Sequence, residues 1–369
     1  MDPQRLAHHV VQSSLRIGRD EHVLINTWQH TLPLAEALAL ECLRADALPL
    51  IQLTTDHLYR AVISEISEYT LRKAPQHVLA AYNTLSAIIH IHGPENPRVF
   101  ELGAVGRSAA LQEGAQPLLA RAIERRVRKA ELHAGYITPE RARKYGADYH
   151  DWLAAHDAAL TVDPAHMAEA GRPLAERMSG ARAVRITHPG GTNLTVNCTG
   201  RKAFVDDGIV DEEDVAAGNV WTELPGGTVN IAPRETSAGG RAVFPAVPLW
   251  GKIIQDVDWD FKSGELIDFH AYEHGIIVTD FLADAREHGS RRLGRIGIGL
   301  NPKARSLAPG LDDASVRGAV TIGLGDNRAL GGENATGFNW ACTLVGATVE
   351  VDGLIVVEAG KLAQAEAVA

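Results

Sequence analysis

The sequence has few cysteines and no long apolar run, and both absences narrow what the protein can be. Cys42, Cys198 and Cys342 are scattered along 369 residues without a C-x-x-C spacing, so we expect buried, reduced thiols with no catalytic role. No run approaches the roughly 20 apolar residues that a membrane span requires. The polar N-terminus, MDPQRLAHHVVQSSLRIGRD, lacks the apolar core of a secretion signal. We therefore expect a cytoplasmic protein that has no membrane partner.

An excess of basic residues and a dinucleotide fingerprint are also missing. The formal net charge is −10, which argues against a nucleic-acid partner because such proteins carry basic faces. No G-x-G-x-x-G follows the first expected strand, so a nucleotide cofactor is not supported. What is present is ordinary globular composition, with 45% apolar and 22% charged residues. A chain of this length usually divides its core, so two domains are expected.

The first half of the chain alternates short apolar runs with stretches of helical periodicity. Such alternation predicts an α/β domain with a parallel sheet, which we place at residues 1–178. The expected strands are 22–28, 48–54 and 85–97, and the expected helices are 31–47, 116–135 and 139–160.

Near residue 180 the pattern changes to short strands separated by glycine-rich turns. THPGGTNLTVNCTGR indicates two strands joined by a Pro-Gly-Gly turn, and similar stretches follow to the C-terminus. Only 278–294 has helical character. We therefore predict a β-rich, barrel-like domain at 179–369 that carries most of the active site.

Several motifs of the second half resemble one known superfamily. GRIGIGLNPKA, GAVTIGLGDN, LGGENATGFNW and VEVDGLIVVEAG occur in that order, and VLINTW and HIHGPENPR stand in the first half. Together they resemble the thermophilic aminopeptidases (the aminopeptidase T superfamily), which include the iron-dependent, ring-cleaving 2,5-dihydroxypyridine 5,6-dioxygenases. The resemblance covers nearly the whole chain. It implies the two-domain fold, a small-molecule substrate and a homodimer.

The metal-ligand positions of that superfamily are substituted in this sequence. The resemblance places the peptidase ligands at Thr228, Arg295, Thr321, Asn339 and Ala341, and the dioxygenase ligands at the second, fourth and fifth of these. A dimetal peptidase needs carboxylates and imidazoles, and a non-haem iron site needs two histidines and a carboxylate. We therefore expect no metal at these positions and no cofactor. Iron held by relocated ligands is the alternative.

Arg295 and Asn339 are the residues that we expect to hold an anionic oxygen of the substrate. A guanidinium binds such an oxygen in two-pronged fashion, and an amide adds one further donor. A salt-bridged arginine and a turn-capping asparagine remain the structural alternatives.

Five further residues complete the predicted site. His188 and Glu333 are expected to move protons, and Thr228, Thr321 and Asn334 are expected to line the substrate pocket. The structural alternatives are a histidine that bonds to its own turn and a solvated loop glutamate.

Two pairs of histidines stand outside this set. His90 and His92 alternate on the strand expected at 85–97, so either can point into a cleft between the domains. His270 and His274 have i, i+4 spacing, but no third ligand follows nearby. Asn96 is expected to shape the turn after the strand.

Four functions are compatible with these residues. The first is metal-independent hydrolysis or ring opening of a small heterocyclic or amide substrate, with Arg295 and Asn339 holding the anionic oxygen. The second is an iron-dependent dioxygenase with relocated ligands. A non-catalytic small-molecule-binding protein and a divergent metallo-aminopeptidase are the third and fourth. Binding of small molecules at domain clefts is common to the first three.

Overall fold

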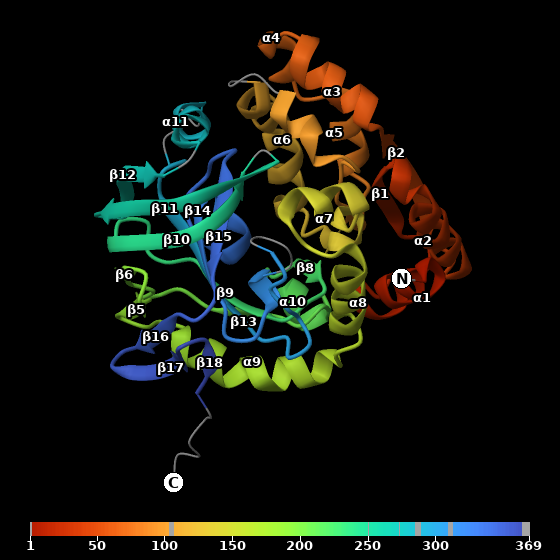
Figure 1. Ribbon diagram of the computed structural model, residues 1–369. Coiled ribbons are helices and arrows are strands. Elements are labelled where there is room, and N and C mark those ends of the chain that lie inside the picture. The colour runs from red at the N-terminus through yellow and green to blue at the C-terminus, as the bar shows by residue number, and fades with distance from the viewer. Residues whose placement is uncertain are drawn as a thin grey trace. The chain divides into compact units, whose positions relative to one another are not determined.

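The chain folds into two units, which the computed structural model describes for residues 2–102, 107–249, 251–272, 274–284, 289–308 and 313–363 (Figure 1). Unit 1 comprises Met1–Leu160 with Gly208–Gly226, and unit 2 comprises Thr161–Asp207 with Gly227–Ala369. The division expected at 178/179 differs from this in two places. Helix α9 (Pro164–Met178) belongs to unit 2. The later segment Gly208–Gly226 belongs to unit 1, because its strand β8 (Trp221–Leu224) extends the unit 1 sheet.

Unit 1 is built on a five-stranded parallel sheet in the order β2-β1-β3-β4-β8, as expected for an α/β domain. The first two strands coincide with the predicted ranges. Besides β8, the strands are β1 (His22–Trp28), β2 (Leu48–Thr54), β3 (Ala87–Ile91) and β4 (Arg128–Leu132).

Helices cover both faces of this sheet. Val23 and Ile25 of β1 pack with α1 and α2 on one face, whereas Leu24 and Ile88 pack toward α5 and α6 on the other. No helix among the described residues has the length and apolar character to cross a membrane. The helices of unit 1 are α1 (Pro3–His8), α2 (Leu32–Arg44), α3 (Asp56–Glu65), α4 (Glu68–Leu71), α5 (Gln76–Tyr82), α6 (Arg107–Glu124), α7 (Pro139–Tyr145), α8 (Tyr149–Ala159) and α10 (Glu212–Ala217).

The helix predicted at 116–135 was wrong in its second half. Helix α6 ends at Glu124, and Arg128–Leu132 forms strand β4 between β3 and β8. Ala130 and Leu132 are completely buried on one face, while charged side chains alternate with them on the other. Alternation with a period of two residues identifies a strand. In the sequence, the charged residues of β4 hid this alternation.

The described residues of unit 2 form two antiparallel sheets and two α-helices, as predicted for a β-rich domain. The eight-stranded sheet has the order β12-β11-β10-β6-β5-β16-β17-β18, and the five-stranded sheet has the order β15-β14-β13-β9-β7. The helices are α9 and α11 (Gly275–Asp284), so the helix predicted to run to residue 294 ends earlier, and residues 285–288 lie outside the described part of the chain. The strands of unit 2 are β5 (Val184–Thr187), β6 (Asn193–Val196), β7 (Phe204–Asp206), β9 (Thr228–Ile231), β10 (Gly239–Leu249), β11 (Lys252–Lys262), β12 (Glu265–Ala271), β13 (Leu293–Gly299), β14 (Val320–Gly325), β15 (Asn339–Leu344), β16 (Thr348–Val351), β17 (Leu354–Glu358) and β18 (Lys361–Leu362).

The five-stranded sheet has one apolar and one polar face. Ile296 and Ile298 of β13, with Ile322 of β14, are fully buried in the main hydrophobic core of unit 2. Because side chains alternate along a strand, the intervening residues point to the opposite face. That opposite face carries the positions at which the sequence predicts the site.

Candidate functional site

The polar face of the five-stranded sheet brings together four of the seven predicted site residues. The antiparallel register aligns Arg295 of β13 with Gly323 of β14, and Gly323 with Ala341 of β15. Two of the substituted dioxygenase-ligand positions are therefore in one row across three strands. The polar face consists of Thr228, Asn230, Arg295, Gly297, Gly299, Thr321, Gly323, Gly325, Asn339, Ala341 and Thr343.

Arg295 is held on this face by Asn230, a residue that the sequence did not single out. The Arg295 Nε donates a hydrogen bond to Asn230 Oδ1 over 2.9 Å, and Asn230 Nδ2 donates to Thr228 Oγ1 over 2.8 Å. Asn230 and Thr228 are both buried. A Cβ atom at Gly297 would lie 2.8 Å from the same Asn230 oxygen. Glycine at position 297 therefore leaves room for the Asn230 side chain, which orients Arg295.

The other predicted residues on the polar face differ in exposure. Thr321 is buried, and its hydroxyl shares a 2.9 Å hydrogen bond with the hydroxyl of Thr343. Asn339 begins β15 opposite Gly325, and it is exposed, as is Ala341 two residues later. Asn339 is thus accessible on the face that carries Arg295.

His188 lies on the other sheet of unit 2. It follows β5 in the eight-stranded sheet, and its Nδ1 accepts a hydrogen bond from the Gly190 backbone over 3.0 Å. This is the geometry of a histidine that bonds to its own turn, which leaves Nε2 as the nitrogen not engaged in that bond.

Glu333 and Asn334 lie in the glycine-rich loop between β14 and β15. The Glu333 side chain is 77% exposed. The Asn334 side chain is buried, and its Nδ2 donates to the carbonyls of Gly289 (2.9 Å) and Gly325 (2.7 Å). Its amide group therefore holds the loop in place.

A buried ion pair anchors this loop, and sequence spacing gave no signal for it. Arg201 Nη2 contacts Glu235 Oε2 over 2.6 Å, and its Nη1 donates to the Gly331 carbonyl over 2.7 Å. Glu235 Oε1 accepts from the Glu333 backbone (2.8 Å) and from Asn327 Nδ2 (3.0 Å). Burial raises the pKa of Glu235, but these donors and Arg201 together lower it below its ordinary value.

A second polar cluster lies in unit 1, at the carboxyl ends of the parallel strands. Register places Asn26 of β1 beside His90 of β3, His90 beside Glu131 of β4, and Glu131 beside Glu223 of β8. His92 follows directly after β3. The sequence predicts that His90 or His92 points into a cleft between the domains, and it gives no signal for Glu131.

The His–Glu cluster, defined as His90, His92 and Glu131, is tightly grouped. One ligand atom from each residue lies within 4.8 Å of the others, and His92 Nε2 is 2.8 Å from Glu131 Oε2. The imidazole rings of His90 and His92 are 4.8 Å apart, and Tyr136 stacks on His92. Among the described residues, this is the group of histidines and carboxylates suited to a metal ion; His270 and His274 do not belong to it.

Burial and charge strongly affect the titratable groups of this cluster. Burial lowers the pKa of His90 to about 4. Burial would raise the pKa of Glu131, but Lys129 and His92 hold it well below the ordinary value. Burial would lower the pKa of Lys129, whose ammonium group contacts Glu131 Oε1, yet the carboxylate raises it. Lys129 and Glu131 are therefore a charged pair.

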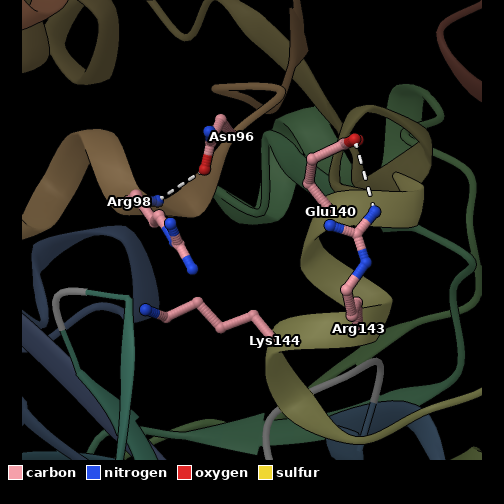
Figure 2. Close-up of a pocket in the computed structure, with 5 residues that line it drawn as sticks. All are labelled: Asn96, Arg98, Glu140, Arg143 and Lys144. Carbon is pink, nitrogen blue, oxygen red and sulfur yellow. Dashed lines mark hydrogen bonds and ion pairs between the residues drawn. The ribbon is translucent and has the colours of Figure 1, made fainter.

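Unit 1 also has a small cationic pocket of about 360 Å³ beside the turn that follows β3. Figure 2 shows the ends of Arg98 and Lys144 directed toward one another, while Arg143 lies beside Glu140 at 3.7 Å. Asn96 Oδ1 accepts from the backbone of Arg98 over 3.0 Å, so Asn96 shapes the turn as predicted. The pocket contains none of the predicted site residues.

Comparison with solved structures shows which fold the chain has. The structure of wild-type AmpT from Thermus thermophilus matches with a TM-score of 0.67 and 17% identity, covering 98% of this chain and 99% of that one. The 2,5-dihydroxypyridine dioxygenase from Pseudomonas putida KT2440 matches with a TM-score of 0.61 and 15% identity, covering 99% and 97%. At these identities the two structures establish the fold. No curated protein matches the sequence.

The family follows from a match to the sequence itself. The family model for NicX, 2,5-dihydroxypyridine 5,6-dioxygenase, matches residues 161–364, which is more than half of the chain. The chain belongs to the NicX family, and the superfamily resemblance stated from its motifs is confirmed. Its family and fold are those of enzymes of the dihydroxypyridine dioxygenase and aminopeptidase T type.

Proposed function

We propose that the protein hydrolyses or opens a small heterocyclic or amide substrate, and that Arg295 binds the anionic oxygen which develops in the reaction. The observation that carries this proposal is the Arg295–Asn230 hydrogen bond, because it fixes an arginine at a position to which the superfamily resemblance assigns a metal ligand. A planar guanidinium in a fixed orientation is suited to an enolate, phenolate or carboxylate oxygen.

The family's iron does not fit the residues at its own ligand positions. Arg295 supplies a permanent cation, Asn339 a neutral amide and Ala341 a methyl group. A non-haem iron site of the dioxygenase type requires two imidazoles and a carboxylate. The donor set on the polar face therefore favours binding of an anion over binding of a cation.

The chemistry proposed for this face is addition of water to a carbonyl carbon. The water oxygen bonds to that carbon, the carbonyl oxygen gains negative charge, and the carbon–nitrogen bond then breaks as nitrogen takes a proton. Arg295 stabilises the charged oxygen, with Asn339 as a second donor on the same face. Glu333 and the Nε2 of His188 are the groups proposed to move protons.

An iron-dependent dioxygenase with relocated ligands is the second candidate. The family assignment favours it, and so does the His–Glu cluster, which has the two-histidine, one-carboxylate composition of non-haem iron sites. In that case oxygen would be consumed, whereas hydrolysis takes its oxygen atom from water.

The source of the incorporated oxygen separates the two candidates. Hydroxylated pyridines and cyclic amides are offered to the chelated, iron-free protein in ¹⁸O-labelled water without O₂. Hydrolysis predicts turnover with label in the product, and loss of turnover in Arg295→Lys. Turnover that requires both O₂ and added iron, with label from ¹⁸O₂, would reject hydrolysis and support the dioxygenase. Ligand binding without turnover in either atmosphere would identify a non-catalytic relative.

A further inference from the structure

The carboxyl end of the unit 1 sheet has the topology of a ligand site. In the strand order β2-β1-β3-β4-β8, the chain first moves from β1 to β2 on one side, and β3 then lies on the other side of β1. Parallel α/β sheets bind ligands outside the carboxyl ends of the strands where the order reverses in this way. His90 lies near this end of β3, beside β1, and His92 comes directly after the strand.

We propose that His90, His92 and Glu131 form a binding site for one divalent transition-metal ion. Imidazole and carboxylate are the ligands that Fe²⁺, Co²⁺ and Zn²⁺ share. The proposal is independent of the chemistry assigned to Arg295, which belongs to unit 2. It supplies a concrete ligand set for the second candidate function.

The spacing of the cluster suits a single ion. Ligand atoms about 2.1 Å from one metal ion are about 3 to 3.5 Å apart when they occupy neighbouring positions. His92 Nε2 and Glu131 Oε2 are already 2.8 Å apart, and no pair of the three ligand atoms exceeds 4.8 Å. Side-chain movements of about 1 Å therefore bring the three ligand atoms to metal-binding distances.

Lys129 occupies one oxygen of the carboxylate and leaves the other. Its ammonium group contacts Glu131 Oε1, whereas His92 lies against Oε2. A metal ion bound through Oε2 can retain the lysine contact on Oε1. The lysine charge then weakens metal binding, because two cations share one carboxylate.

Besides Glu131 Oε2, which has only its ion-pair contact with His92, two buried polar atoms near the cluster have no hydrogen-bond partner among the described residues. They are Asn26 Oδ1, beside His90 in the sheet register, and His30 Nδ1. The other His30 nitrogen is 2.9 Å from the carbonyl of Gly135, and a Cβ on Gly135 would fall 1.6 Å from the His92 carbonyl. Buried polar atoms are normally satisfied, so these two indicate an additional group such as metal-bound water at this end of the sheet.

Titration of the full-length, chelated protein with Co²⁺ tests the site, because bound cobalt has a visible spectrum that needs no turnover. The proposal predicts one Co²⁺ per chain, displaced by Zn²⁺. It predicts at least about 100-fold weaker binding in His92→Asn and in Glu131→Gln, since losing a direct ligand costs more than losing its supporting contacts. Lys129→Met should bind about tenfold more tightly or better, because one repelling charge is removed.

Two controls keep the outcome interpretable. His77→Asn removes an exposed histidine of the same unit and should bind Co²⁺ like the unchanged protein. Circular dichroism and thermal unfolding establish that each variant is folded. If Glu131→Gln does not fold, the test of the metal site uses His92→Asn, because His92 is only partly buried. Absence of stoichiometric cobalt binding, or equal binding by folded His92→Asn, would overturn the metal site while leaving the hydrolytic proposal intact.

Discussion

At the scale of single residues, Arg295 gives the sharpest expectation. Arg295→Lys retains the positive charge but loses the planar, two-pronged donor and the Nε bond to Asn230. We expect turnover to fall by roughly 10² to 10³, equivalent to about 3–4 kcal/mol of transition-state stabilisation. Asn339→Ala should cause a smaller loss, and the two effects should not be additive if both side chains contact one oxygen. Near-normal turnover in folded Arg295→Lys would move the chemistry away from the polar face.

Gly297 offers a test of the orientation of Arg295 that leaves the arginine itself unchanged. A Cβ atom in Gly297→Ala would lie 2.8 Å from Asn230 Oδ1 and 3.3 Å from Thr321 Cβ, so Asn230 must move. We expect about 1–3 kcal/mol of lost stability, typical of overpacking, together with a loss of turnover that approaches that of Arg295→Lys.

Gly239→Ala is the matched control, because a Cβ there meets no atom within 4 Å. Chemical denaturation and turnover are measured on both glycine variants. If Gly297→Ala is destabilised but fully active, the Asn230 contact does not orient the functional group.

At the scale of elements, the loop between β14 and β15 depends on one carboxylate. Glu235→Gln removes the closer carboxylate of the buried Arg201 guanidinium, leaves only the exposed Glu333 carboxylate at 3.5 Å, and should destabilise unit 2 by up to about 3 kcal/mol at pH 7. Glu333→Gln removes the second carboxylate beside the same arginine, and it should have a much smaller effect because that carboxylate is 77% exposed and 3.5 Å away.

The same carboxylate predicts how this difference depends on pH. The folded-state pKa of Glu235 lies below its ordinary value of 4.5, so its stabilising contribution is present above that pH and is lost as the pH falls through the lower folded value. The stabilities of the unchanged protein and Glu235→Gln should therefore converge as the pH falls below 4.5 and through the lower folded-state pKa. A difference that stays constant from pH 7 to pH 3 would show that Glu235 does not act through its charge.

At the scale of the whole molecule, we propose a homodimer that uses the open edge of the unit 1 sheet. Strand β2 is the edge strand, and its Leu48, Leu50 and Leu53 are 54%, 56% and 45% exposed. Leu40 and Leu43 of α2 are exposed to a similar extent. An exposed apolar edge strand is normally covered, and a second copy of the chain is the common cover.

Sedimentation at micromolar concentration should give twice the chain mass of 39.6 kDa for the unchanged protein and a single-chain mass for Leu50→Glu. Ile267→Glu, on the edge strand β12 of unit 2, is the matched control and should remain dimeric. A 39.6 kDa species for the unchanged protein would reject the dimer. Dissociation only in Ile267→Glu would place the interface elsewhere.

The sequence alone determined the fold class and the superfamily resemblance. Strands β1 and β2 were found to the residue because both are short runs rich in apolar residues, although only β1 is buried and β2 is an exposed edge strand. The resemblance singled out Arg295, Asn339 and Ala341, and the sheet register then placed them on one face.

The tertiary structure alone decided which distant residues meet. Strand β4 was missed because Lys129 and Glu131 obscure its apolar side, and their charges are tolerated only where the sheet brings them together beside His92. Asn230 is 65 residues from Arg295 and Glu235 is 34 residues from Arg201. No local spacing encodes such pairs, because sheet register and loop packing bring them together after the chain has folded.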